Sequence, residues 1–164
     1  MAVRDIEDRP SGELLPVQKG VPMCFCCGLE NPHGLKLRFR KESPTSISTQ
    51  FTAPEHWTGW GKILHGGFQT LLLDETMSWV PFGLFGERFF VTKEITIRFL
   101  RPVYVGKPIR VSGSLEEDRD REVITRGEIR DDDGHLLTEA TGILARLKPE
   151  VMESLLSRQE SPRT

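Results

Sequence analysis

Hydrophobic and polar residues alternate in several short stretches of the chain, on either side of one longer helical pattern. Leu35–Phe39 reads Leu, Lys, Leu, Arg, Phe, and Ile47–Phe51 resumes the alternation after the break at Ser43-Pro44. A period of two is typical of a strand with one buried face. The two stretches therefore predict a pair of strands joined as a hairpin.

One helix is predicted from Gly67 to about Val80, with Pro81 ending or kinking it. Its apolar residues recur at helical spacings over more than one face, which indicates that protein surrounds the helix. These residues are Phe68, Leu71, Leu72, Leu73, Met77, Trp79 and Val80.

Four further strands follow the helix, because alternating or β-branched runs are separated there by turn residues. The runs are VTKEITIRFLRPV, KPIRVSGSL, EVITRGEIR and LLTEATGILARL. Two strands, one buried helix and four antiparallel strands define an α+β fold in which a curved sheet wraps around a single helix. Such a sheet leaves an edge and apolar surface open, so we expect the chain to dimerise.

The organisation along the chain indicates one domain, which suits a length of 164 residues. Residues 1–22 mix charges with Pro and Gly and predict a flexible arm, residues 23–148 form the domain, and residues 149–164 form a tail with a possible short helix. Within the domain, APEHWTGWGKILHGG is too irregular for a helix or strand and predicts a loop that helps to form a site.

Composition excludes several classes of protein. The net charge is -2 and no basic tract occurs, so nucleic acid is not an expected partner. No apolar run of about 18 residues predicts a membrane span, and the N-terminus does not resemble a secretory signal. The three cysteines, Cys24, Cys26 and Cys27, are too few and too close for a disulfide framework, so we expect a cytoplasmic protein.

The cysteines also suggest a metal site, since Cys24 and Cys27 form a Cys-x-x-Cys pair with His33 downstream. These residues supply only three ligands, and no second Cys-x-x-Cys completes a tetrahedral zinc site. A packed N-terminal turn is the favoured interpretation, and we expect no metal and no cofactor.

His65-Gly66-Gly67, directly before the helix, is the sharpest candidate for chemistry. The first backbone N–H groups of a helix lack internal partners, and a glycine lets a ligand approach them. Aimed at a carbonyl oxygen that gains negative charge, the N–H of Gly66 would act as an oxyanion hole. His65 is expected to cap the helix and, with Gly67, to lie at the binding site. The alternative is that the glycines only permit close packing.

Asp74 and Glu75 lie among apolar residues of the helix, where a charge is costly unless it is paired or functional. Adjacent helical positions point about 100° apart, so only one of the two faces a given site, and the other is solvated or paired with a base such as Arg88. Asp74 is eight residues, or about 12 Å, beyond Gly66. If both act on one substrate, they belong to different subunits of a two-fold dimer.

The segment LHGGFQTLLLDETMSW resembles the helix of hot-dog acyl-CoA thioesterases of the phenylacetate-pathway type. Weaker similarity runs from Cys24 to Leu147 and includes CFCCGLENPHGLKLRF and VTKEITIRFLRPVYVGK. The resemblance implies a hot-dog fold and hydrolysis of acyl-CoA to free acid and CoA. It also implies that Gly66 polarises the thioester carbonyl while Asp74 of the other subunit attacks it or activates a water molecule, and both mechanisms stay open.

Three further positions match or depart from the pattern of this family. Thr92 matches a family Ser or Thr that binds the water or the carboxylate, although a hydroxyl at a strand entry is an equal alternative. Ser78, on the Asp74 face of the helix, resembles a hydroxyl position of a related branch. Many relatives have Asn or Gln where this chain has Gly59, and His56, Trp57 or Trp60 would be the candidates to fill that place.

The phosphates of CoA, which is part of the substrate, require cations. Of four basic residues after the helix, Arg101 and Lys107 are preferred to Arg98 and Arg110, although a charged outer sheet face is the simpler interpretation of each. Two rivals to a thioesterase remain: an enoyl-thioester hydratase or dehydratase, and a domain that senses acyl-CoA without turnover. Asp74 argues against the sensor. The acyl chain and the choice between a homodimer and a homotetramer are left open.

Overall fold

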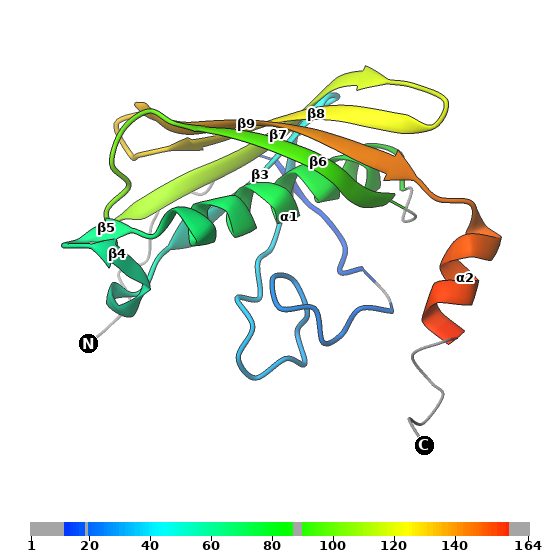
Figure 1. Ribbon diagram of the computed structural model, residues 1–164, viewed down its shortest axis with the longest axis horizontal. Coiled ribbons are helices and arrows are strands. Elements are labelled where there is room, and N and C mark those ends of the chain that lie inside the picture. Colours follow the sequence, from blue (N-terminus) through cyan, green and yellow to red (C-terminus); the bar gives the residue numbers. More distant parts are fainter. Residues whose placement is uncertain (1–11, 19, 87–89, 158–164) are drawn as a thin grey trace.

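The computed structural model describes residues 12–18, 20–86 and 90–157, and shows a curved sheet with one long helix against its inner face (Figure 1). The sheet is antiparallel and has the order β1-β2-β3-β7-β8-β9-β6. This arrangement confirms the predicted α+β hot-dog architecture. The elements are β1 (Glu13–Leu14), β2 (Arg40–Ser43), β3 (Ser46–Thr52), the 3-10 helix η1 (Glu55–Trp57), β4 (Thr58–Trp60), β5 (Ile63–Leu64), α1 (Gly66–Phe85), β6 (Phe90–Phe99), β7 (Pro108–Asp118), β8 (Glu122–Arg130), β9 (Leu136–Arg146) and α2 (Pro149–Ser157).

The central helix α1 is buried, as its apolar pattern predicts, but it does not end at Pro81. It continues to Phe85, and Gly86 ends it in a left-handed conformation, with φ of 73° and its N–H donating to the Phe82 carbonyl. A proline inside a helix costs about 3 kcal/mol. Burial of Pro81 and of the neighbouring Phe82 side chain offsets this cost, so the predicted end was wrong by about one turn.

Glycines on the middle strands let α1 approach the sheet closely. A Cβ at Gly127 of β8 would lie 2.9 Å from Leu73 and 3.1 Å from Met77, and one at Gly113 of β7 would lie 2.9 Å from Val80. Real Cβ atoms essentially never come nearer than about 3.0 Å, so the short separation between helix and sheet depends on these glycines.

The first predicted strand lies in a different place. Residues 35–39 are irregular, and β2 starts only at Arg40. Lys36 has φ of 55°, which no strand residue adopts, and the N–H of Leu37 donates to the Cys26 carbonyl at 2.8 Å. The alternation of apolar and polar residues still predicts burial correctly at two positions, since the side chains of Leu37 and Phe39 are buried. The backbone of this stretch thus pairs with the cysteine loop, and the predicted hairpin is formed by residues 40–52.

Small elements occur in two places where the sequence predicted none. β1 lies within the segment 1–22, most of which is outside the described residues, and pairs with β2. The next residue, Leu15, is buried and donates its N–H to Phe39 at 2.9 Å. In the segment 53–67, the expected irregular loop contains η1 and the β4–β5 hairpin. Each of these elements is too short to show a period in the sequence.

The four strands after the helix overlap the predicted runs, although β6 starts one residue earlier, at Phe90, and β7 continues past Leu115 to Asp118. Their order in the sheet was not predictable. β6 pairs with β9 and forms one edge of the sheet, because a crossover connection separates it from β7. Most of β6 is exposed, including Val91 and Phe99. A ten-residue edge strand with apolar side chains is a template for pairing with another chain. In the described parts of the chain, no helix is long and apolar enough to cross a membrane.

Candidate active site

His65 closes the N-terminus of α1 as the predicted cap. Its Nδ1 accepts a hydrogen bond from the N–H of Gly67 at 3.0 Å, and its carbonyl accepts from the N–H of Phe68 at 3.0 Å. Among the described residues, no acceptor is seen for the N–H of Gly66. Of the two glycine donors, Gly66 is therefore the one left for a ligand, whereas Gly67 is held by the cap.

The side chain of Phe99 lies beside Gly66. A Cβ at Gly66 would be only 3.2 Å from the Phe99 ring, so any larger residue would push the ring away. Phe99 belongs to the exposed edge strand β6 and is 56% exposed. The start of α1 and the open edge of the sheet thus form one continuous surface.

Asp74, Thr92 and Ser78 come together on the outer face of α1 against β6. The Thr92 hydroxyl donates to Oδ1 of Asp74 at 2.7 Å, and the hydroxyls of Ser78 and Thr92 are 3.3 Å apart. Asp74 and Ser78 are one helical turn apart, and β6 brings in Thr92 from 18 residues farther along the chain. A carboxylate oriented by a hydroxyl can activate water or attack a carbonyl carbon.

Gly66 and Asp74 of one chain remain far apart, because α1 is continuous between them. Eight residues at 1.5 Å each give about 12 Å along the helix axis. One carbonyl group cannot contact both residues of a single subunit.

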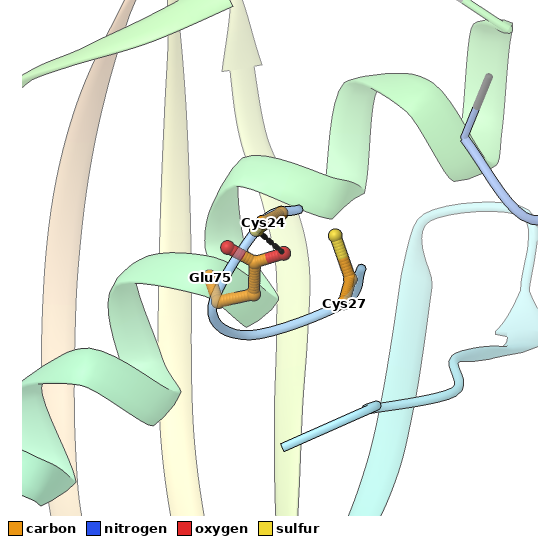
Figure 2. Close-up of side chains that lie close together, drawn as sticks. All are labelled: Cys24, Cys27 and Glu75. Carbon is orange, nitrogen blue, oxygen red and sulfur yellow. Dashed lines mark hydrogen bonds between the residues drawn. The ribbon is translucent and has the colours of Figure 1, made fainter. Parts of the chain in front are cut away.

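Glu75, the second acid of the pair, points to the other side of α1 and into the protein. Its Oε1 accepts from the Trp79 indole N–H at 2.9 Å and lies 4.0 Å from the Cys24 sulfur (Figure 2). Burial raises the pKa of Glu75 above its ordinary value. Among the described residues, the partners of Glu75 are an indole and thiols. Arg88, the base suggested as its partner, lies outside the described residues, so pairing with it stays untested.

Cys24 and Cys27 converge on Glu75 from the loop before β2, as Figure 2 shows. A hydrogen bond from the Cys27 thiol, supported by backbone N–H groups that include those of Cys26 and Gly28, lowers the pKa of Cys24 to about 5. The same Cys24–Cys27 bond, together with burial, raises the pKa of Cys27. Sequence reasoning noticed the Cys-x-x-Cys pair and the unexplained acid, but nothing in the sequence connected them.

Gly59 packs directly against His65. A Cβ at Gly59 would lie 3.2 Å from the Cα of His65, so the Asn or Gln expected there would displace the cap. Of the three residues considered as replacements, Trp57 is buried and stacks on Phe68 at 4.1 Å, while His56 is exposed and Trp60 is 84% exposed. Trp60, the more exposed of the two tryptophans, lies on the strand β4 that pairs with β5 directly before the helix.

The basic residues proposed for phosphate binding differ in their charge pairing. Arg98 pairs with Glu139 at 2.9 Å, and Arg110 pairs with Glu42 at 3.2 Å. Arg101 and Lys107 are exposed, and neither has an ion pair with a described residue. These two side chains keep an unneutralised charge.

The sequence matches the thioesterase superfamily over residues 61–138, the stretch that contains the helix cap, Asp74 and Thr92. A relative from Saccharolobus solfataricus, whose name provisionally calls it an esterase, is 30% identical over 97 residues, which are 59% of this chain and 69% of the relative. The chain therefore belongs to the thioesterase superfamily.

Solved structures agree with this assignment. A thioesterase superfamily protein is 25% identical with a TM-score of 0.64, over 72% of this chain but only 57% of that protein's length. A hypothetical thioesterase protein of Streptococcus pneumoniae, solved with coenzyme A, is 15% identical with a TM-score of 0.62, over 68% of this chain and 85% of that one. The PaaI protein of the E. coli phenylacetic acid degradation operon is 17% identical with a TM-score of 0.57, over 63% of this chain and 73% of that one. At these identities, the last two show a shared fold.

Proposed function

We propose that this protein hydrolyses acyl-CoA thioesters to the free acid and CoA. The observation that carries the proposal is the bond of 2.7 Å from the Thr92 hydroxyl to the Asp74 carboxylate, on the accessible face of α1. A carboxylate that is oriented by a hydroxyl, and not neutralised by an observed cation, suits a base or a nucleophile. Membership of the thioesterase superfamily supports a thioester as the substrate, and the coenzyme A bound to the S. pneumoniae protein supports CoA as its thiol part.

The N–H of Gly66 stabilises the oxygen of the thioester carbonyl as negative charge develops on it. Gly66 opens α1, so the positive end of the helix dipole adds to this stabilisation. Asp74 either takes a proton from water, which then attacks the carbonyl carbon, or attacks that carbon itself to form an anhydride that water later hydrolyses. In both routes the CoA thiolate leaves and takes up a proton.

The proposed enzyme is a dimer, because Gly66 and Asp74 of one subunit are about 12 Å apart along α1. A two-fold axis between antiparallel copies of α1 brings Gly66 of each subunit toward Asp74 of the other and creates two equal sites. The exposed edge of β6, with Val91 and Phe99, is the surface that such a partner would cover.

At the rim of the site, Arg101 and Lys107 bind the phosphate groups of CoA. Both are exposed and lack an ion pair with a described residue, so a phosphate displaces no existing bond. His65 and Gly67 shape the entrance by fixing the start of α1, and Ser78 supports Thr92.

The test is release of free thiol from short, medium, long and aryl acyl-CoAs by the wild-type protein and by Asp74→Asn. Asp133→Asn, in the turn between β8 and β9, is the matched control because it removes an exposed carboxylate that makes none of the contacts of the Asp74, Thr92 and Ser78 group. All three proteins must show equal folding and equal subunit number. We expect turnover to fall at least about a hundredfold in Asp74→Asn and to stay unchanged in the control.

Other results would overturn the proposal in distinct ways. Tight binding of acyl-CoA without thiol release would exclude hydrolysis and favour a sensor. Hydration of an enoyl-CoA without thiol release would favour a hydratase. Equal thiol release by wild type and Asp74→Asn would support hydrolysis but show that Asp74 is not catalytic.

A further inference from the structure

The group formed by Cys24, Cys27 and Glu75 has no part in the proposed hydrolysis, although it lies next to Asp74 along α1. Two sulfurs and a carboxylate oxygen, from segments 51 residues apart, lie within 4.8 Å of one another (Figure 2). We propose that these three residues bind one zinc ion, or a divalent ion of similar chemistry, which fastens the N-terminal cysteine loop to α1.

The spacing of the three side chains suits tetrahedral zinc. Zinc–sulfur bonds of about 2.3 Å and zinc–oxygen bonds of about 2.0 Å place tetrahedral ligand atoms about 3.5 to 3.8 Å apart. The Cys24 sulfur is 4.0 Å from Oε1 of Glu75, and no pair in the group exceeds 4.8 Å. Closing the ligands on an ion therefore requires shifts of less than about 1 Å, which side-chain rotations provide.

The loop is shaped as a turn that presents its sulfurs on one side. The N–H of Gly28 donates to the Cys24 carbonyl at 3.0 Å, which brings the two cysteines to the same face of the turn. A Cβ at Gly28 would lie 2.5 Å from the nitrogen of Cys24 and 2.6 Å from its oxygen, so only glycine fits this tight fold.

Glu75 is oriented by a further residue, as metal ligands usually are. The Trp79 indole donates to its Oε1 at 2.9 Å and holds the carboxylate toward the cysteines. While Cys24 is protonated, its thiol donates to the carboxylate. Once the two thiols have lost their protons, three negative charges this close repel one another unless a cation lies between them. A divalent cation neutralises two of the three negative charges, and the two thiol protons pass to solvent.

A fourth ligand has room to bind. A cavity of about 120 Å³ adjoins the group and is lined by Cys24, Cys27, Glu75, Ser78 and the aromatic residues Trp79 and Phe90, among others. A water molecule in this cavity completes four-coordination. Three protein ligands with two sulfurs favour zinc over magnesium or calcium, which prefer oxygen.

His33, which the sequence suggested as a third ligand, does not belong to the group. It is exposed, and its backbone N–H donates to Asn31. Asp131, Asp133 and His135 form another set of possible ligands in the turn between β8 and β9. His135 bonds to Asp131 there, and exposed acidic groups of this kind are common without an ion.

The first experiment titrates the metal-free, reduced full-length protein with Zn²⁺ in competition with a coloured chelator, and then with Co²⁺. We expect one ion per chain, with a dissociation constant below about 1 μM, and a cobalt spectrum with sulfur-to-metal charge transfer and tetrahedral bands. A thiol count before each titration verifies that Cys24 and Cys27 are reduced. Absence of the charge-transfer band in reduced, folded protein would overturn the proposal.

Variants then test the ligand set. Cys24→Ser, Cys27→Ser and Glu75→Gln should each weaken zinc binding at least about a hundredfold, since loss of an outer-shell partner alone costs tenfold to a hundredfold. His33→Ala and Asp133→Asn serve as controls and should bind as the wild type does.

Glu75→Gln is the safest variant, because it keeps the shape of the side chain and its bond to Trp79. Equal affinity of Glu75→Gln and wild type would remove the carboxylate from the set. Loss of binding in His33→Ala or Asp133→Asn would show that the ion binds elsewhere. Because zinc binding is measured without substrate, its outcome is independent of whether the protein hydrolyses thioesters.

Discussion

Thr92→Val isolates the bond that orients the proposed catalytic carboxylate. Valine has nearly the shape of threonine and keeps the β-branch that suits β6, but it cannot donate to Oδ1 of Asp74, which now receives a bond of 2.7 Å. The fold should therefore be preserved while the carboxylate loses one partner.

The magnitude follows from the bond and from its exposure. A hydrogen bond to a charged group contributes about 1.5 to 3 kcal/mol, and Thr92 is exposed, so water can replace part of it. We therefore take the lower end of this range, about 1.5 kcal/mol. A change of about 1.4 kcal/mol in the activation free energy changes the rate tenfold. We expect kcat/KM for the best acyl-CoA to fall about tenfold in Thr92→Val.

Two further substitutions, Thr92→Ser and Ser78→Ala, provide the controls. Thr92→Ser keeps the hydroxyl and should retain activity within about threefold. The Ser78 hydroxyl is 3.3 Å from that of Thr92, so it is the next donor available to the site. Ser78→Ala alone should change little, but Ser78→Ala combined with Thr92→Val should reduce activity by more than the product of the two single effects.

Steady-state thiol release, with subunit number and melting temperature measured for every variant, decides the outcome. Unchanged kcat/KM in Thr92→Val would show that the bond has no catalytic value. An equal loss in Thr92→Ser and Thr92→Val would assign the effect to packing of β6 and not to the hydroxyl.

Three further changes test packing, assembly and ionisation. Gly127→Ala should destabilise the fold by about 1 to 3 kcal/mol, because its Cβ would lie 2.9 Å from Leu73, and should lower the melting temperature by about 2 to 12 °C; an unchanged melting temperature would contradict the close approach of α1. Val91→Lys on β6 should lower subunit number in light scattering and thiol release together, whereas a monomer with full activity would refute the shared site. In metal-free protein, Cys24 should be the thiol alkylated fastest near neutral pH, as mass spectrometry can show. Since the Cys27 thiol lowers the pKa of Cys24 to about 5, its alkylation rate should fall only as pH drops through about 5, and a rate that still rises steeply above pH 8 would contradict this.

The sequence predicted those features that depend on neighbours along the chain. The strands after the helix, the buried character of α1 and the cap at His65 all follow from local periodicity or from the chemistry of helix ends. The spacing of Gly66 and Asp74 is likewise local, because a helix fixes distance from residue number. If both residues act on one substrate, as proposed, sequence alone yields the argument that one subunit cannot complete the site.

The errors of sequence reasoning occur where distant segments override a local preference. Pro81 predicts the end of the helix or a kink in it, but α1 continues past Pro81, which is buried in the core, to Phe85. Residues 35–39 alternate like a strand, yet the cysteine loop binds their backbone. The order of the sheet, with β6 at the edge, depends on a crossover that no short pattern encodes.

The two acids of α1 show most clearly what the sequence determines and what only the tertiary structure determines. The sequence determined that Asp74 and Glu75 point in different directions, since consecutive helical residues do. The tertiary structure puts Thr92 of β6 against Asp74, a contact that only the family resemblance had suggested. It also puts Cys24 and Cys27, from a loop about 50 residues earlier, against Glu75, which nothing in the sequence indicated. The physical reason is that a side chain's direction follows from its own backbone, whereas its partners are set by packing of segments that the sequence keeps far apart.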